Sequence, residues 1–140
     1  NEIAVSWYRK AAENGRANAM LQMGNCYRDG KGVEQNFAKA APWYEKGAAA
    51  GNLDCMNQLG IRYALGQGVA QETETAASWY RKAAEGGHAW AQFNLGCSYR
   101  DGKGVEKNPK KALLWFRKAA EQGIKEADAE IDKLDAEAED

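Results

Sequence analysis

The 140-residue sequence predicts an all-α solenoid of about eight helices. The first observation is a period of 36 residues, and four of the five tryptophans share one phase of it: Trp7, Trp43, Trp79 and Trp115. The second is that apolar residues inside each period recur at helical spacing. The third is that glycine follows each predicted helix, where a residue with positive φ commonly ends a helix. Repetition at a fixed period of this length is typical of helical repeat arrays.

The period divides the chain into three full repeats with a partial repeat at each end. These segments are a half repeat at 1–15, full repeats at 16–51, 52–87 and 88–123, and an acidic capping helix at 124–140. The opening residues already follow the repeat pattern, which is typical of a segment of a longer chain. The last segment holds eight acids and two lysines, so we expect it to give the end of the stack a soluble surface.

The first helix of each full repeat is predicted at 17–29, 53–65 and 89–101. In the first repeat Ala19, Met23 and Tyr27 stand at i, i+4 and i+8 and define the buried stripe. A glycine interrupts this helix in every repeat, at Gly24, Gly60 and Gly96. A glycine inside a helix costs about 1 kcal/mol relative to alanine. We therefore expect the partner helix to approach closely there, with Trp and Tyr side chains laid against the glycine.

The second helix is predicted at 37–50, 73–86 and 109–122. Its Ala and aromatic residues share one face, so the four tryptophans in phase are predicted to be substantially buried. Asn108-Pro109 is typical of an N-cap followed by proline in the first turn. Pro42 would lie inside a helix that begins near Phe37, which predicts a kink or a late start in that helix.

The repeated motif resembles the Sel-1-like repeat family, which is related to tetratricopeptide repeats. The second full repeat shows the motif in order: Cys55, Leu59-Gly60, Tyr63, Gly66, Gly68-Val69, Ala76, Trp79-Tyr80, Ala83-Ala84 and Gly87. The match runs over residues 4–123 almost continuously. The resemblance implies a right-handed α-α superhelix, a tetratricopeptide-like solenoid whose first helices line a concave groove.

The groove residues follow from the helical wheel once the resemblance has assigned the groove to the first helices. Positions opposite the buried stripe recur in the three repeats: Asn18, Leu21, Asn25 and Arg28; Asp54, Asn57 and Ile61; and Trp90, Phe93, Cys97 and Arg100. The repeat does not require Trp90, because Asn18 and Asp54 occupy the same position. Aromatic residues beside arginine are typical of protein-binding hot spots. Packing of Trp90 and Phe93 against neighbouring helices is the alternative interpretation.

Composition and motifs argue against several other function classes. The net charge of −1 provides no overall field for nucleic acid, and no apolar run approaches the roughly 20 residues that span a bilayer. The single histidine, His88, is predicted to cap or face solvent at a helix start, and the cysteines lack metal-ligand spacing. Cys26 and Cys55 lie about 10 Å apart along the helix axes, beyond disulfide reach. We therefore expect no enzyme, no cofactor and no small-molecule substrate.

The sequence thus predicts a protein-protein interaction module, a scaffold or adaptor that binds a peptide or protein in the groove. Trp90 and Phe93 would anchor the partner, with Arg28 and Arg100 supplying charge. The alternative is a structural spacer, one stretch of a longer solenoid that has no partner site of its own.

Overall fold

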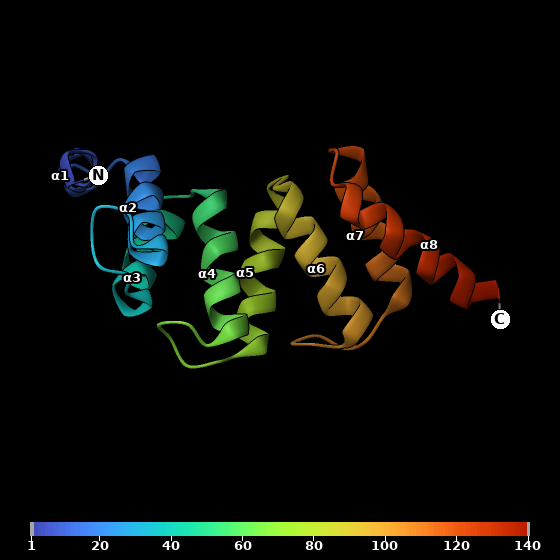
Figure 1. Cartoon of the computed structure of the whole chain (residues 1–140). Helices are drawn as coiled ribbons and strands as arrows, with labels where there is room; N and C mark the ends of the chain where they lie inside the picture. The colour runs from blue at the N-terminus through green and yellow to red at the C-terminus, as the bar shows by residue number, and fades with distance from the viewer. Residues whose placement is uncertain (1, 140) are drawn as a thin grey trace. The chain divides into compact units, whose positions relative to one another are not determined.

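The computed structural model describes residues 2–139, which form eight α-helices and no strand (Figure 1). In chain order they are α1 (Glu2–Glu13), α2 (Ala17–Asp29), α3 (Phe37–Ala49), α4 (Leu53–Leu65), α5 (Thr73–Glu85), α6 (Ala89–Asp101), α7 (Pro109–Glu121) and α8 (Lys125–Glu139). The all-α prediction of about eight helices is confirmed. Each predicted first helix has the expected bounds, and each second helix ends one residue before the expected position.

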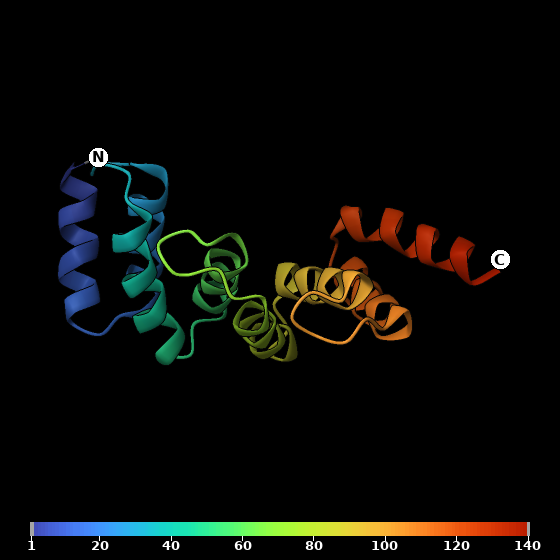
Figure 2. The same cartoon turned by 90° about the horizontal axis from the view of Figure 1, so that it is seen from below.

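The chain forms two compact units, one with α1 to α4 in residues 1–72 and one with α5 to α8 in residues 73–140. In the first unit, α2 contacts α1, α3 and α4, and α3 also contacts α4. In the second unit, α6 contacts α5 and α7, and α7 also contacts α8. Within each unit, successive helices therefore pack side by side (Figures 1 and 2).

Side chains and glycines close the helix ends. Three asparagine side chains accept a hydrogen bond from the backbone N–H three residues further on: Asn36, Asn52 and Asn108. His88 Nδ1 accepts one from the N–H of Ala91 at 3.1 Å, which confirms the predicted capping role. Three helices end at a glycine in the left-handed conformation: Gly30, Gly66 and Gly102.

The aromatic core differs from the prediction. Trp7 is 70% exposed, and the later tryptophans in phase, Trp43, Trp79 and Trp115, are only partly buried. The buried aromatic residue is the next one along the second helix: Tyr44, Tyr80 or Phe116. One residue is a rotation of about 100° on a helix. The tryptophan therefore turns to the edge of the packed face, and its neighbour enters the core.

The partly buried tryptophans instead lie beneath lysines of the same helices. The Nζ atoms of Lys46, Lys82 and Lys118 lie 4.7, 4.6 and 4.5 Å from the ring centroids of the tryptophans three residues earlier. These lysines stand in the last helical turn, where a positive charge also favours the helix dipole. Each of these rings therefore lies beneath a solvated cation, and Trp43 also packs against the core of the first unit.

Two of the glycines inside the first helices, Gly24 and Gly96, face aromatic rings, as expected for close helix approach. A methyl group added at Gly96 would lie 2.8 Å from two ring carbons of Phe116, and one at Gly24 would overlap the ring of Tyr44. The predicted approach is confirmed for the tyrosine position, whereas the tryptophan is not the contacting residue. Gly47, in the second helix α3, has a related role because an added methyl would overlap Cys55 Sγ.

Pro42 lies inside α3, which begins at Phe37 and continues to Ala49. The expected late start is therefore wrong. Pro42 has no N–H to donate to the carbonyl of Ala38, and its side chain is exposed, so water can solvate that carbonyl. We expect amide hydrogen exchange to be faster in 37–47 than in 109–119, the matching segment of α7. Equal protection of the two segments, measured by mass spectrometry, would show that proline does not weaken α3.

The C-terminal helix α8 packs against α7. Ala127 and Leu134 are buried and Ile131 is partly buried, so these apolar residues form the face that packs. The first turn carries Glu126 and Asp128, which favour the positive end of the helix dipole.

Candidate functional site

Of the three groups of residues assigned to the groove from the sequence, the group on α6 includes an exposed aromatic residue, Trp90. Its residues are Trp90, Phe93, Cys97 and Arg100, spaced at i, i+3, i+7 and i+10, so they share one face of the helix. Trp90 is 45% exposed, and the other three are partly buried. The structure therefore brings together all four residues that the sequence analysis assigned to the third repeat.

Two ring contacts hold the aromatic part of this face in place. Trp90 meets Phe93 edge to face, with ring centroids 5.8 Å apart and planes at 82°. Phe93 in turn contacts Phe116, at a centroid distance of 5.4 Å. Since Phe116 is fully buried, the ring sequence runs from the core to the surface and ends at Trp90. Edge-to-face and tilted pairs of this kind add about 0.5–1.5 kcal/mol beyond simple burial.

The charge at Arg100 is already balanced within the second unit. Its guanidinium donates to both carboxylate oxygens of Asp101 at 2.9 Å and to Glu130 of α8. The hydrogen bonds from Arg100 hold the pKa of Asp101 below its ordinary value. The sequence analysis missed Glu130, which lies thirty residues further on in the acidic segment. An arginine with two carboxylate partners does not need an acidic group from a partner.

On α2, the four assigned residues have different surroundings. Asn18 is exposed, whereas Leu21 is buried, with 8% of its surface exposed. Asn25 accepts a hydrogen bond from the Tyr44 hydroxyl at 2.7 Å, and Arg28 pairs with Asp29 at 2.8 Å. Three of the four therefore pack or bond within the first unit.

On α4, Asp54 is exposed, Ile61 is partly buried and Asn57 is buried. The expectation that Leu21 and Asn57 face an open groove is wrong, because both are covered by the protein. The surfaces of α2 and α4 thus offer polar or small exposed groups where α6 offers Trp90.

The three thiols are free and differ in burial. Cys26 and Cys55 are buried, whereas Cys97 on the α6 face is partly exposed. Burial raises the pKa of the Cys97 thiol to about 11 and that of Cys55 to about 12, so both are protonated at neutral pH. Neither thiol has the lowered pKa of a nucleophilic cysteine.

We expect a maleimide reagent to label Cys97 before Cys26 and Cys55, because Cys97 is the most accessible of the three. Since only the thiolate reacts, the rate at Cys97 should rise with pH across the range below its pKa. Peptide mapping after short pulses at pH 7 and pH 9 measures both effects. Faster labelling of Cys26 would show that α2 opens more readily than the α6 face.

Within residues 2–139, no group of three His, Cys, Asp or Glu side chains is placed to hold a metal ion. No helix in the same range is long and apolar enough to cross a membrane.

The helix pairs, the glycine contacts and the periodic caps together define a helical repeat protein. The Sel1 repeat family matches the chain at residues 1–15, 17–52, 53–88 and 91–124, so the chain belongs to the Sel1 repeat family. Proteins of this family are generally non-catalytic repeat scaffolds that bind other proteins. The resemblance identified from the sequence is confirmed.

Solved structures of similar proteins show the same fold. A protective antigen present in uropathogenic Escherichia coli strains, which displays an SLR fold, is 38% identical with a TM-score of 0.82. A Sel1 repeat protein from Oxalobacter formigenes is 35% identical with a TM-score of 0.84, and Helicobacter pylori cysteine rich protein B is 27% identical with a TM-score of 0.72. These likenesses confirm the predicted solenoid class.

The matched regions differ in how much of each protein they cover. They include 85%, 90% and 90% of this chain, in the same order, and 26%, 51% and 90% of the three similar proteins. The chain therefore spans about a quarter of the first protein's length and about half of the second's. Comparison with curated protein sequences gives no match.

Proposed function

We propose that this chain is a protein-interaction module that binds a partner peptide or protein on the α6 face, with Trp90 as the anchor. The observation that carries the proposal is the exposure of Trp90, 45% of which is open to solvent. The equivalent position is Asn18 in the first full repeat and Asp54 in the second, and the equivalent helices α2 and α4 form without an aromatic residue there. The fold therefore does not require tryptophan there, which favours recognition as its role.

The surroundings of Trp90 suit an anchor. Phe93 holds the indole from the side, and Phe116 supports Phe93 from the core, so the indole is preorganised. A preorganised aromatic residue loses little conformational freedom when a partner binds. Because Asp101 and Glu130 already pair with Arg100, the contact with the partner would be mainly apolar. An apolar side chain of a partner peptide is therefore the group that this face fits.

The alternative role is that of a spacer within a longer solenoid. The short coverage of two similar proteins supports it, since this chain spans 26% and 51% of their lengths. In that role Trp90 would pack against another part of the parent protein.

A peptide-display selection separates the two roles. The library is selected on the wild-type chain alone, and the selected peptides are then tested for binding to Trp90→Asn, which carries the residue of the first repeat at this position. The proposal expects selected sequences to share an apolar or aromatic residue and to lose binding to Trp90→Asn. Selected peptides that bind both proteins equally would leave Trp90 without a binding role and favour the spacer.

A further inference from the structure

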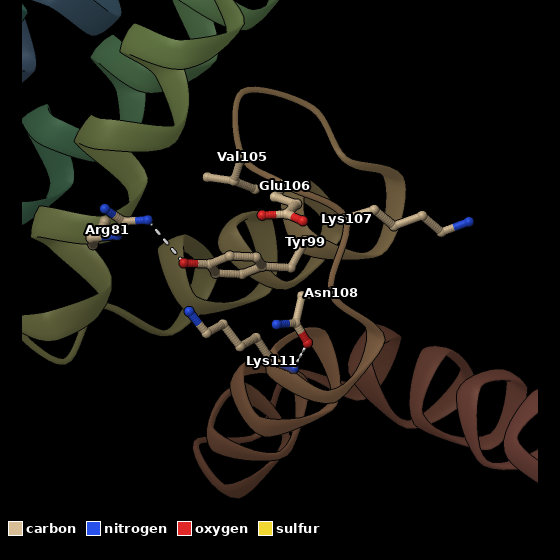
Figure 3. A pocket seen from close by; sticks show the side chains of 7 residues that line it. All are labelled: Arg81, Tyr99, Val105, Glu106, Lys107, Asn108 and Lys111. Atoms are coloured by element: carbon tan, nitrogen blue, oxygen red, sulfur yellow. Dashed lines mark hydrogen bonds between the residues drawn. The ribbon is translucent and has the colours of Figure 1, made fainter.

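A second surface, separate from the α6 face, surrounds Tyr99 in the second unit. A pocket of about 390 Å³ opens there between the end of α6, the following loop and the start of α7, with Arg81 of α5 at one side (Figure 3). Its lining residues are Arg81, Tyr99, Val105, Glu106, Lys107, Asn108 and Lys111. In Figure 3, the Lys107 side chain extends away from Tyr99, whereas Arg81 and Lys111 approach it from different sides.

The pocket is rich in hydrogen-bond donors. Arg81 Nη2 donates to the Tyr99 hydroxyl oxygen at 2.9 Å, so the hydroxyl hydrogen remains available to another acceptor. The Nζ of Lys111 lies 5.5 Å from the centroid of the same ring. Within residues 2–139, no carboxylate forms an ion pair with Arg81 or Lys111. Tyrosine, guanidinium and ammonium donors around one cavity favour an oxyanion as the ligand.

The first unit repeats the arrangement 72 residues earlier. Arg9 Nη2 donates to the Tyr27 hydroxyl at 3.2 Å, and the Nζ of Lys39 lies 5.8 Å from the Tyr27 ring centroid. Two separate places in the chain therefore combine one tyrosine, one arginine and one lysine in the same way.

The equivalent positions midway between the two clusters lack both basic residues. Tyr63 keeps the tyrosine position, but Glu45 stands where the arginine would be, and Thr75 stands where the lysine would be. Burial, with smaller contributions from Glu45 and Glu72, raises the pKa of Tyr63. The three helices that carry these positions, α3, α4 and α5, each have 13 residues, as do α2, α6 and α7. Packing of the repeat therefore does not account for the basic residues around Tyr99 and Tyr27.

From this geometry we infer that the pocket around Tyr99 binds an oxyanion carried by an acidic peptide, with Arg81 and Lys111 as its ligands and the cluster at Tyr27 as a second site. The oxyanion is a carboxylate or a phosphorylated side chain, since both accept hydrogen bonds in the same geometry. Glu106 lines the same pocket, and its negative charge would repel the bound anion and weaken its binding. The inference does not depend on the α6 face, because it involves none of the residues assigned there.

The test uses three labelled peptides of equal length: a glutamate-rich peptide, a phosphoserine-rich peptide and a glutamine-rich peptide. Binding is measured by fluorescence anisotropy at low salt with the whole chain. Arg9→Glu/Arg81→Glu introduces at both positions the glutamate that the chain carries at the equivalent position 45. Lys46→Glu/Lys118→Glu is the matched control, because it changes the net charge equally at lysines that lie over tryptophans. Lys39→Thr/Lys111→Thr is a second test variant that retains both arginine–tyrosine hydrogen bonds.

We expect the wild type and the lysine control to bind at least one anionic peptide, and both test variants to bind it at least tenfold more weakly. Glu106→Gln should tighten binding, because it removes a negative charge from the pocket. Tighter binding of the phosphoserine peptide would identify phosphate as the preferred oxyanion, and equal binding would identify any oxyanion. The inference is overturned if the glutamine peptide binds equally well, or if the control weakens binding as much as Arg9→Glu/Arg81→Glu does. Thermal melts of each variant establish that it is folded.

Discussion

Phe116→Ala is expected to lower the free energy of unfolding by about 3–5 kcal/mol, the usual cost of removing a buried aromatic side chain. Phe116 is fully buried, lies against Gly96 of α6 and supports Phe93. Removing its ring leaves a cavity between two helices that contact each other closely. Urea denaturation followed by circular dichroism measures the loss.

The neighbouring residue provides the control. Trp115 is larger than Phe116 but only partly buried, with the Nζ of Lys118 4.5 Å from its ring centroid. Trp115→Ala should therefore cost about 1 kcal/mol, because less apolar surface returns to water. A larger loss for Trp115→Ala than for Phe116→Ala would mean that the tryptophans are the core after all.

The effect of Gly96→Ala on the free energy of unfolding is expected to depend on whether the Phe116 ring is present. In the wild type an added methyl would lie 2.8 Å from two ring carbons of Phe116, and overpacking of this kind costs about 1–3 kcal/mol. The substitution also gains about 1 kcal/mol, because alanine favours the helix interior. The net result should be a loss of stability of up to about 2 kcal/mol.

In the Phe116→Ala background the ring is gone, and only the helix preference remains. Gly96→Ala should then stabilise the protein by about 1 kcal/mol. The double-mutant cycle, measured by the same urea titrations, gives the coupling between the two positions. Additive effects would contradict the close contact between α6 and α7, whereas a change of sign would support it.

The sequence predicted the helices well because the period carries that information directly. Helix bounds from the 36-residue repeat agree with the structure within one residue. The period does not say which repeated residue enters the core, since Trp43 and Tyr44 recur in the same way. Gly24 indicated where a ring packs, because a glycine inside a helix lets a side chain of the neighbouring helix approach its backbone. Its ring comes from Tyr44 rather than Trp43.

The sequence predicted the surroundings of some candidate site residues correctly and of others incorrectly. Trp90 is exposed, as expected from its helical wheel, but Leu21 and Asn57 are buried. A wheel drawn for one helix defines one buried face, whereas α2 contacts three other helices. Phe93 was expected to lie off the packing face, and that expectation is wrong because its ring contacts Phe116. The pair between Arg100 and Glu130 joins positions thirty residues apart, which no period in the sequence links.

The most direct test of the proposed function is a titration of a selected peptide against the wild-type chain and Trp90→Asn, with a melting curve for each. The account predicts that the substitution weakens binding by about 30-fold or more, since an anchoring residue contributes about 2 kcal/mol or more. It also predicts little change in melting temperature, because asparagine occupies the same position in the first repeat. Unchanged affinity together with a sharp fall in melting temperature would contradict the account and make Trp90 a packing residue.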